Sequence, residues 1–229
     1  MAVRVLSRLA SRLRTPSLQE LVPFAILALA AAMLAIFGRL AGAVLDGDTH
    51  VLDEALLRAL RNPADPADPI GPAWLEHMMR DVTSLGSFTV VALVSLGAIG
   101  YLLIDGKKAA ALFVLVAVAG GTVLSELLKH VFARPRPELV AHLVDVQTMS
   151  FPSGHAMLSA VTFLTLGALL TRVQGRRRLK AYILSIAILL TLLIGASRVY
   201  LGVHWPTDVL AGWCAGAAWA MACWVLATW

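Results

Sequence analysis

Long apolar segments alternate with short polar connections along most of the 229-residue chain. Each is close to the roughly 17–25 residues that a helix needs to cross the hydrocarbon core of a bilayer. Lipid-exposed backbone must satisfy its own hydrogen bonds, so helices are favoured over strands. The pattern predicts an all-α fold, a polytopic membrane helical bundle with six transmembrane helices. They are expected at about residues 21–44, 84–104, 109–128, 153–171, 181–198 and 207–228.

The one long polar region, residues 45–83, is expected to form the first outer loop. Leucines at helical spacing predict a short amphipathic helix with one apolar face, made of Leu52, Leu56, Leu57 and Leu60. The prolines of NPADPADPIGP end this helix. Pro72 suits the first turn of a second short helix that carries Trp74, Met78 and Met79.

The same region is rich in acidic side chains. It holds Asp46, Asp48, Asp53, Glu54, Asp65, Asp68, Glu76 and Asp81. Their spacing singles out no set of convergent carboxylates, so we interpret the region as a solvated loop without a metal site.

Composition and charge support a membrane protein and orient it. The chain is 59% hydrophobic and 14% charged, whereas about a quarter of an ordinary soluble domain is charged. Three segments on one side of a six-span bundle hold 11 of the 19 Lys and Arg residues: Arg4, Arg8, Arg12, Arg14, Lys107, Lys108, Arg172, Arg176, Arg177, Arg178 and Lys180. The positive-inside rule places this side, with both termini, in the cytoplasm, as in a bacterial inner membrane. Such spread-out cations do not resemble a nucleic-acid-binding patch.

The chain is expected to have two parts. Residues 1–20 form a basic cytoplasmic segment, in which residues 3–14 have the pattern of a helix lying on the anionic membrane surface. A cleavable signal peptide and a mitochondrial presequence are alternatives, but the long apolar run that follows favours a retained span. Residues 21–229 form one six-span domain. Cys214 and Cys223 lie within its last apolar segment and show neither ligand spacing nor a disulfide framework.

Polar residues in two outer connections are unusual for a membrane bundle. The connection after the third span carries Lys129, Arg134 and Arg136, and the one after the fifth span follows Arg198. Ionisable groups at membrane depth are costly and usually functional. The positive-inside rule predicts few cations on the outer side of the membrane. Cations found there therefore indicate a bound anion.

The local pattern around these cations suits phosphate. Arg134 and Arg136 each precede a proline, which favours extended backbone, so the two side chains can project to similar sides. The sequence PSGH at residues 152–155 opens a helix, whose free N–H groups can bind an oxyanion. His204 and Asp208 lie four residues apart and share one face of a helix start, where the aspartate can orient the imidazole.

These motifs together resemble the signature of the type-2 phosphatidic acid phosphatase superfamily, which reads KxxxxxxRP, PSGH and SRxxxxxHxxxD. The chain matches all three parts, at residues 129–137, 152–155 and 197–208. The motifs cover residues 129–208, and the six-helix layout extends the resemblance to most of the chain. The resemblance implies an integral membrane phosphatase of a lipid phosphate monoester or pyrophosphate, such as phosphatidate, phosphatidylglycerophosphate or an isoprenyl pyrophosphate. It implies no cofactor and no metal.

The resemblance also implies a phosphate-binding role for five residues. Lys129, Arg136 and Arg198 are expected to bind the phosphate oxygens and to stabilise the charge that develops in the transition state. The backbone at Ser153 and Gly154 is expected to contribute as well. Arg134 lies outside the signature, and we expect it to be an auxiliary phosphate contact.

Three further residues are implied to carry the chemistry. His204 is the nucleophile that forms a phosphohistidine, and Asp208 orients it. His155 protonates the leaving group and then activates water. On the predicted topology these residues face the periplasm.

Two other functions use the same anion site. A transporter or flippase of phosphorylated lipids would bind phosphate, but it has no need for His204, His155 and Asp208 in this arrangement. A phosphatase of a soluble phosphate ester is the other alternative. The expected partners are a phospholipid or isoprenoid phosphate substrate and the membrane lipids, with no nucleic acid.

Overall fold

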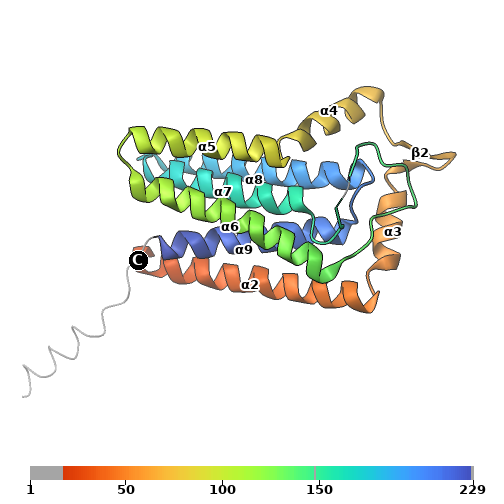
Figure 1. Cartoon of the computed structure of the whole chain (residues 1–229), viewed down its shortest axis with the longest axis horizontal. Coiled ribbons are helices and arrows are strands. Elements are labelled where there is room, and N and C mark those ends of the chain that lie inside the picture. Colours follow the sequence, from red (N-terminus) through yellow and green to blue (C-terminus); the bar gives the residue numbers. More distant parts are fainter. Residues whose placement is uncertain (1–17, 147, 228–229) are drawn as a thin grey trace, which may run out of the picture.

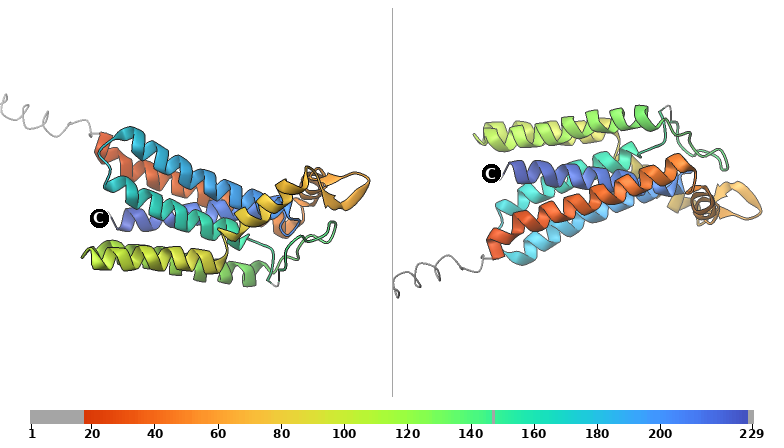
Figure 2. Two further views of the ribbon diagram at one scale, coloured as in Figure 1. Left: turned by 90° about the horizontal axis from the view of Figure 1, so that it is seen from above. Right: turned by 90° about the horizontal axis from the view of Figure 1, so that it is seen from below.

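A computed structural model describes residues 18–146 and 148–227 of the chain (Figure 1). The predicted basic surface helix at residues 3–14 lies outside the described residues. Long helices run side by side along one axis, and the two further views show them as a single bundle (Figure 2). These helices are α2 (Leu18–Asp46), α5 (Phe88–Ile104), α6 (Lys108–Phe132), α7 (Gly154–Arg172), α8 (Arg177–Tyr200) and α9 (Pro206–Leu226).

The number of spans agrees with the hydrophobic pattern. Within the described residues, α2, α6, α7, α8 and α9 are each long and apolar enough to cross a membrane. The sixth span is a bent pair, α4 (Ala73–Ser84) followed by α5, with 49° between the two helices. The predicted membrane bundle of six helices is confirmed.

The second short helix predicted after Pro72 is present as α4, which contains Trp74, Met78 and Met79. What the sequence did not predict is that this helix joins α5 through a bend. The break lies at Gly86, where an added Cβ would come within 2.4 Å of the Ile194 side chain of α8. Ser87 then begins α5, and its hydroxyl accepts a hydrogen bond from the Val90 N–H over 3.3 Å. α4 therefore continues into the membrane span and lies over the end of α8.

The first outer loop contains more structure than the sequence indicates. α3 (His50–Arg58) lies across the end of the bundle, nearly perpendicular to the long helices (Figure 1). The proline-rich stretch after it forms a small antiparallel hairpin of β1 (Arg61–Asn62) and β2 (Asp65–Pro69). This hairpin was not predicted.

The buried face of α3 is also not the expected leucine face. Of the four leucines, Leu57 is fully buried, whereas Leu52 and Leu56 are exposed. The other fully buried residue on this face of α3 is Asp53, one turn before Leu57. The interpretation of all eight acids as solvated is therefore wrong for Asp53.

α7 and α9 pack with their backbones in close approach, and glycines on α9 make this possible. A Cβ added to Gly212 would lie 2.7 Å from the Ser153 carbonyl oxygen, and one added to Gly216 would lie 2.5 Å from the Met157 carbonyl oxygen. Small residues let membrane helices approach this closely. The contact brings the first turn of α7 against the first turn of α9.

We expect Gly216→Ala to destabilise the bundle by about 1–3 kcal/mol, because the new methyl group overlaps backbone that has little room to move. Thermal unfolding in detergent should show this as a lower melting temperature. Gly97→Ala on α5 is the matched control, since nothing lies within 4 Å of its added Cβ. Equal melting temperatures for the two variants would contradict the close packing.

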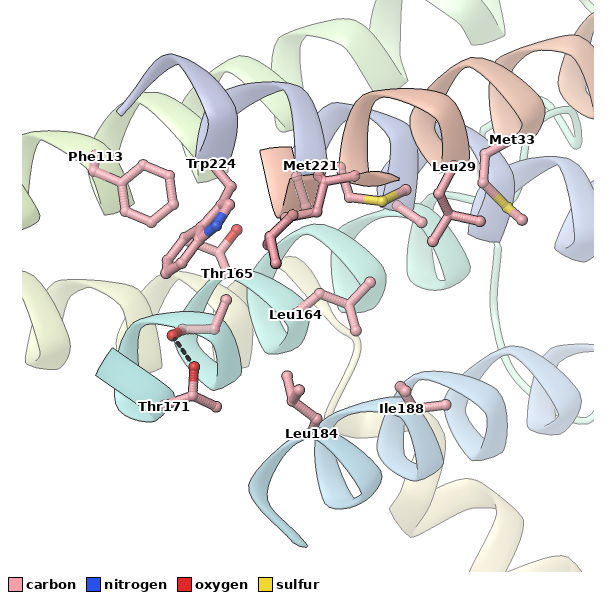
Figure 3. Close-up of a pocket in the computed structure, with 15 residues that line it drawn as sticks. Leu29, Met33, Phe113, Leu164, Thr165, Thr171, Leu184, Ile188, Met221 and Trp224 are labelled. Atoms are coloured by element: carbon pink, nitrogen blue, oxygen red, sulfur yellow. Dashed lines mark hydrogen bonds between the residues drawn. The ribbon is translucent and has the colours of Figure 1, made fainter. Parts of the chain in front are cut away.

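One cavity of the bundle is apolar and lies far from the polar end. It has a volume of about 560 Å³ and is lined by residues of α2, α6, α7, α8 and α9. Figure 3 shows Leu29, Met33, Leu164, Leu184, Ile188 and Trp224 around it. None of its lining residues is ionisable, so it offers no group for acid–base or nucleophilic chemistry.

Candidate active site

A second cavity, of about 580 Å³, lies at the end of the bundle where α6 and α8 end and α7 begins. Because successive spans run in opposite directions, these helix ends meet at one membrane face. Six of the predicted site residues line the cavity: Lys129, Arg136, Gly154, His155, Arg198 and His204. The structure thus brings together residues that are up to 75 positions apart in the chain (204 − 129).

His204 presents one ring nitrogen to the cavity and the other to Asp208. The first turn of α9 fixes Asp208, whose Oδ2 accepts the Trp205 N–H over 2.9 Å. The same oxygen lies 3.4 Å from His204 Nδ1, and Ser150 donates its hydroxyl to it. His204 Nε2 lies 3.1 Å from Nη1 of Arg136. A guanidinium only donates, so Nε2 accepts, and the ring proton belongs on Nδ1.

The environment keeps His204 uncharged. Burial lowers the pKa of its imidazole well below the ordinary value, and the nearby charges of Arg136, Arg198 and Lys129 lower it further. A neutral ring with its lone pair on Nε2 is the form that can attack an electrophile. The cations that disfavour protonation of His204 are those expected to bind phosphate.

Lys129 and Gly154 form one wall of the cavity. Lys129 lies in the last turn of α6 and is only 8% exposed. Its Nζ would be 3.1 Å from a Cβ at position 154, so glycine there lets the ammonium approach the start of α7. Nζ also donates to Thr148 over 3.1 Å and lies 3.4 Å from a carboxylate oxygen of Glu126. The first-turn N–H groups of α7 and this ammonium together favour an anion.

Arg136 is held by backbone carbonyl groups. Its Nη1 donates to the Val203 carbonyl over 2.6 Å, and its Nε donates to the Thr148 carbonyl over 2.7 Å. Arg198, at the end of α8, donates from Nη1 to the Thr83 hydroxyl over 2.9 Å.

Two buried polar atoms at this site have no hydrogen-bond partner among the described residues. They are Nε of Arg198 and the hydroxyl of Ser153. Buried polar groups are nearly always paired, and Arg198 lines the cavity, so a bound oxyanion would satisfy its Nε. Ser153, which we expected at the phosphate, does not line the cavity.

The cavity suits an anion better than a metal ion. Three cations line it, and no group of three or more His, Cys, Asp or Glu side chains that could hold a metal occurs in the described part of the chain. Two imidazoles, His155 and His204, also line it.

Arg134 does not occupy the place that we expected for it. It does not line the cavity and is only 6% exposed. Its guanidinium instead binds Asp208 over 2.7 Å and Asp53 over 2.8 Å. The two carboxylates already occupy both terminal nitrogens, so the expected auxiliary phosphate contact is not what the structure shows.

Sequence analysis missed several residues that support the site. Thr83, Thr148 and Ser150 carry no pattern that distinguishes them from other polar loop residues. Asp53 does have one signal, because it lies four residues before Leu57 and so shares the buried face of α3. An acid on the apolar face of an amphipathic helix indicates a buried partner.

Comparison with known families gives an independent view of this site. The family model described as the PAP2 superfamily matches residues 110–229, a range that contains all three motifs.

Individual relatives are similar over different shares of the chain. Phosphatidylglycerophosphatase B of Bacillus subtilis is 33% identical over 183 residues, which cover 77% of this chain and 84% of that protein. An undecaprenyl-diphosphatase of Sulfolobus acidocaldarius is 37% identical over 100 residues, covering 42% of this chain and 44% of the relative. The crystal structure of a transmembrane PAP2-type phosphatidylglycerolphosphate phosphatase from Bacillus subtilis superposes with a TM-score of 0.76 and 28% identity, covering 85% of this chain and 93% of that one.

Proposed function

Because the chain belongs to the PAP2 superfamily, we propose that it hydrolyses the phosphate monoester or pyrophosphate of a membrane lipid through a phosphohistidine at His204. The observation that carries this proposal is the position of His204 Nε2. It lies at the wall of a cavity that three cations line, while Asp208 is on the other side of the ring.

In the first step the lone pair of Nε2 attacks phosphorus in line with the bond to the lipid oxygen. That bond breaks, and the oxygen leaves with its electron pair and takes a proton from His155. Lys129, Arg136 and Arg198 bind the remaining phosphate oxygens, where charge develops in the transition state. The imidazole becomes cationic, and the Asp208 carboxylate at Nδ1 stabilises that charge.

In the second step a water molecule replaces the lipid. His155, now neutral, takes a proton from the water as its oxygen attacks phosphorus. The N–P bond breaks, its electrons return to His204, and inorganic phosphate leaves. His155 regains its proton, so both histidines are ready for another cycle.

We place the active site on the periplasmic face of a bacterial inner membrane. The cationic loops of the described chain lie between α5 and α6 and between α7 and α8, at the end of the bundle opposite the cavity (Figure 1). The positive-inside rule assigns that end to the cytoplasm.

A lipid substrate is favoured over a soluble one by the surroundings of the cavity. Phe88, which is 64% exposed at the start of α5, and Leu158 of α7 line it beside the polar groups. The relatives named above are enzymes of two different lipid phosphates, which supports the class of substrate without choosing a member.

A phosphate-release panel tests the substrate class. We expect purified protein in detergent to release phosphate from at least one of phosphatidate, phosphatidylglycerophosphate and undecaprenyl pyrophosphate, faster than from glycerol 3-phosphate. Excess chelator should change the rate by less than about twofold, since cations of the chain itself take the place of a metal. Turnover that chelator abolishes would contradict this mechanism, and a preference for glycerol 3-phosphate would favour a soluble substrate.

The alternative of a flippase is tested with the same protein in vesicles. Hydrolysis without movement of a fluorescent phosphatidate between leaflets is the expected result. Lipid movement that survives in His204→Ala, with no phosphate release by the wild-type protein, would favour the flippase.

A further inference from the structure

The buried guanidinium of Arg134 lies behind the catalytic pair rather than in the cavity. Nη1 donates to Asp208 Oδ1 over 2.7 Å and to the Thr207 hydroxyl over 2.9 Å. Nη2 donates to Asp53 Oδ2 over 2.8 Å and to the Thr49 hydroxyl over 3.1 Å. Both carboxylates are fully buried, so this is a closed ionic cluster of one cation and two anions.

These contacts determine which oxygen of Asp208 faces His204. Arg134 holds Oδ1, and Oδ2 is left to accept the Ser150 hydroxyl and the Trp205 N–H and to face Nδ1 of His204. A carboxylate is planar and rigid, so fixing one oxygen fixes the direction of the other. The orientation of the imidazole therefore depends on Arg134 through Asp208.

Asp53 completes the arrangement from a distant part of the chain. Its Oδ1 accepts the Thr207 N–H over 3.0 Å and its Oδ2 accepts the Thr207 hydroxyl over 2.7 Å. Asp53 thus holds both Arg134 and the first turn of α9, which carries Asp208. Without the cation, the two buried carboxylates would repel each other across Thr207, and protonation of one would relieve that repulsion.

We infer that Arg134 and Asp53 are positioning residues of the active site, which hold Asp208 in the orientation and charge state that phosphorylation of His204 requires. This inference rests on the proposed function. The cluster keeps one net negative charge (+1 − 2), next to the ring that becomes cationic when the N–P bond forms.

The cluster also makes α3 a part of the active site. Asp53 and Leu57 form its inner face, while the outer face exposes Val51 (84%), Leu52 (57%) and Leu56 (45%). The outer loop thereby supplies a side chain that acts on the catalytic aspartate.

Steady-state kinetics separate positioning from phosphate binding. We expect Arg134→Gln to lower kcat about 10–100-fold, as is typical when an outer partner of a reactive group is lost, with KM changed by less than about threefold because Arg134 does not line the cavity. The matched variant is Arg136→Gln, two residues on, which should raise KM. An equal rise in KM for Arg134→Gln would overturn the inference and restore the auxiliary phosphate contact.

A double-mutant cycle shows whether Arg134 acts through Asp208. In the Asp208→Asn background, Arg134→Gln should cause less than about a threefold further loss of kcat, since the group that it positions is already altered. Losses that multiply would overturn the inference, because they would mean a separate structural role. Asp53→Asn, which keeps the shape of the side chain, enters the same cycle and takes the place of Arg134→Gln if that variant does not fold.

A readout that needs no turnover separates this inference from the proposed function. In nitrogen-15 NMR of labelled histidines, the His204 signal, identified by its loss in His204→Gln, should report a proton on Nδ1 in the wild-type protein. Arg134→Gln and Asp53→Asn should shift it toward a mixture of tautomers. An unchanged His204 signal overturns the positioning role, whereas failure of the wild-type protein to hydrolyse any lipid phosphate overturns the proposed function.

Discussion

His204→Ala is expected to lower phosphate release from the preferred lipid by about 10⁴-fold or more. Removal of the nucleophile of a covalent mechanism typically has an effect of this size or larger. The imidazole is 1% exposed, and its two nitrogens contact Arg136 and Asp208. Asp208 itself does not line the cavity.

Phosphate binding should survive this change. Lys129 and Arg198 reach the cavity from α6 and α8. Arg136 donates to the imidazole, but the Thr148 and Val203 carbonyls also hold its guanidinium. We therefore expect calorimetry to give a dissociation constant for inorganic phosphate within about threefold of the wild-type value. Loss of binding together with activity would mean that the variant has lost the site rather than the nucleophile.

The matched control is His130→Ala. His130 follows Lys129 at the end of α6, but it is exposed and does not line the cavity. It should retain more than about half of the wild-type activity. A loss comparable to that of His204→Ala would contradict the assignment of the nucleophile. The N–P bond of a phosphohistidine hydrolyses in acid, so the samples are quenched with denaturant at alkaline pH. Mass spectrometry should then detect a phosphorylated protein in the wild type and in His130→Ala, but not in His204→Ala.

The sequence was sufficient to predict the bundle and six of the residues that line its polar cavity. Membrane thickness sets the length of each span, and the alternation of spans places the end of α6, the start of α7 and the end of α8 at one face. Motifs at those helix ends must therefore be neighbours. That is why Lys129, His155 and His204 could be assigned to one site without knowledge of helix packing.

The residues behind the site could not be predicted in the same way. Arg134 and Arg136 have the same local pattern, each followed by proline, yet one lies behind His204 and the other in front of it. The difference depends on Asp53, which is 81 residues before Arg134 and buried only because α3 folds over the end of the bundle. Long-range pairing of this kind leaves only a faint local signal, here an acid one turn before a buried leucine.

The bend at Gly86 has a similar origin. The hydrophobic pattern alone starts the second span near residue 84, whereas the structure joins α4 to α5 at 49°. The bend brings Thr83 to the Arg198 guanidinium. Gly86 lies close to Ile194 because the second span packs against α8. The sequence of the second span alone carries no information about this packing.

His155→Ala should also reduce activity strongly, by about 10²–10⁴-fold on a lipid monoester, because general acid and base catalysis contribute about this much. The loss should depend on the leaving group. An alkoxide needs a proton as it leaves, so the first step becomes limiting for a lipid monoester. Nitrophenolate is stable without a proton, so nitrophenyl phosphate should still phosphorylate His204 at a rate within about tenfold of the wild-type rate.

The two steps can then be seen separately in one variant. With nitrophenyl phosphate, His155→Ala should release about one equivalent of nitrophenol per active site in a rapid burst, followed by slow turnover, because no base activates water for the second step. The lipid monoester should give no burst. Equal losses for both substrates, without a burst, would contradict a role for His155 in proton transfer and assign it to phosphate binding. His155 lines the cavity one residue after Gly154, and the burst measures whether it transfers a proton to the leaving oxygen and from the water that takes its place.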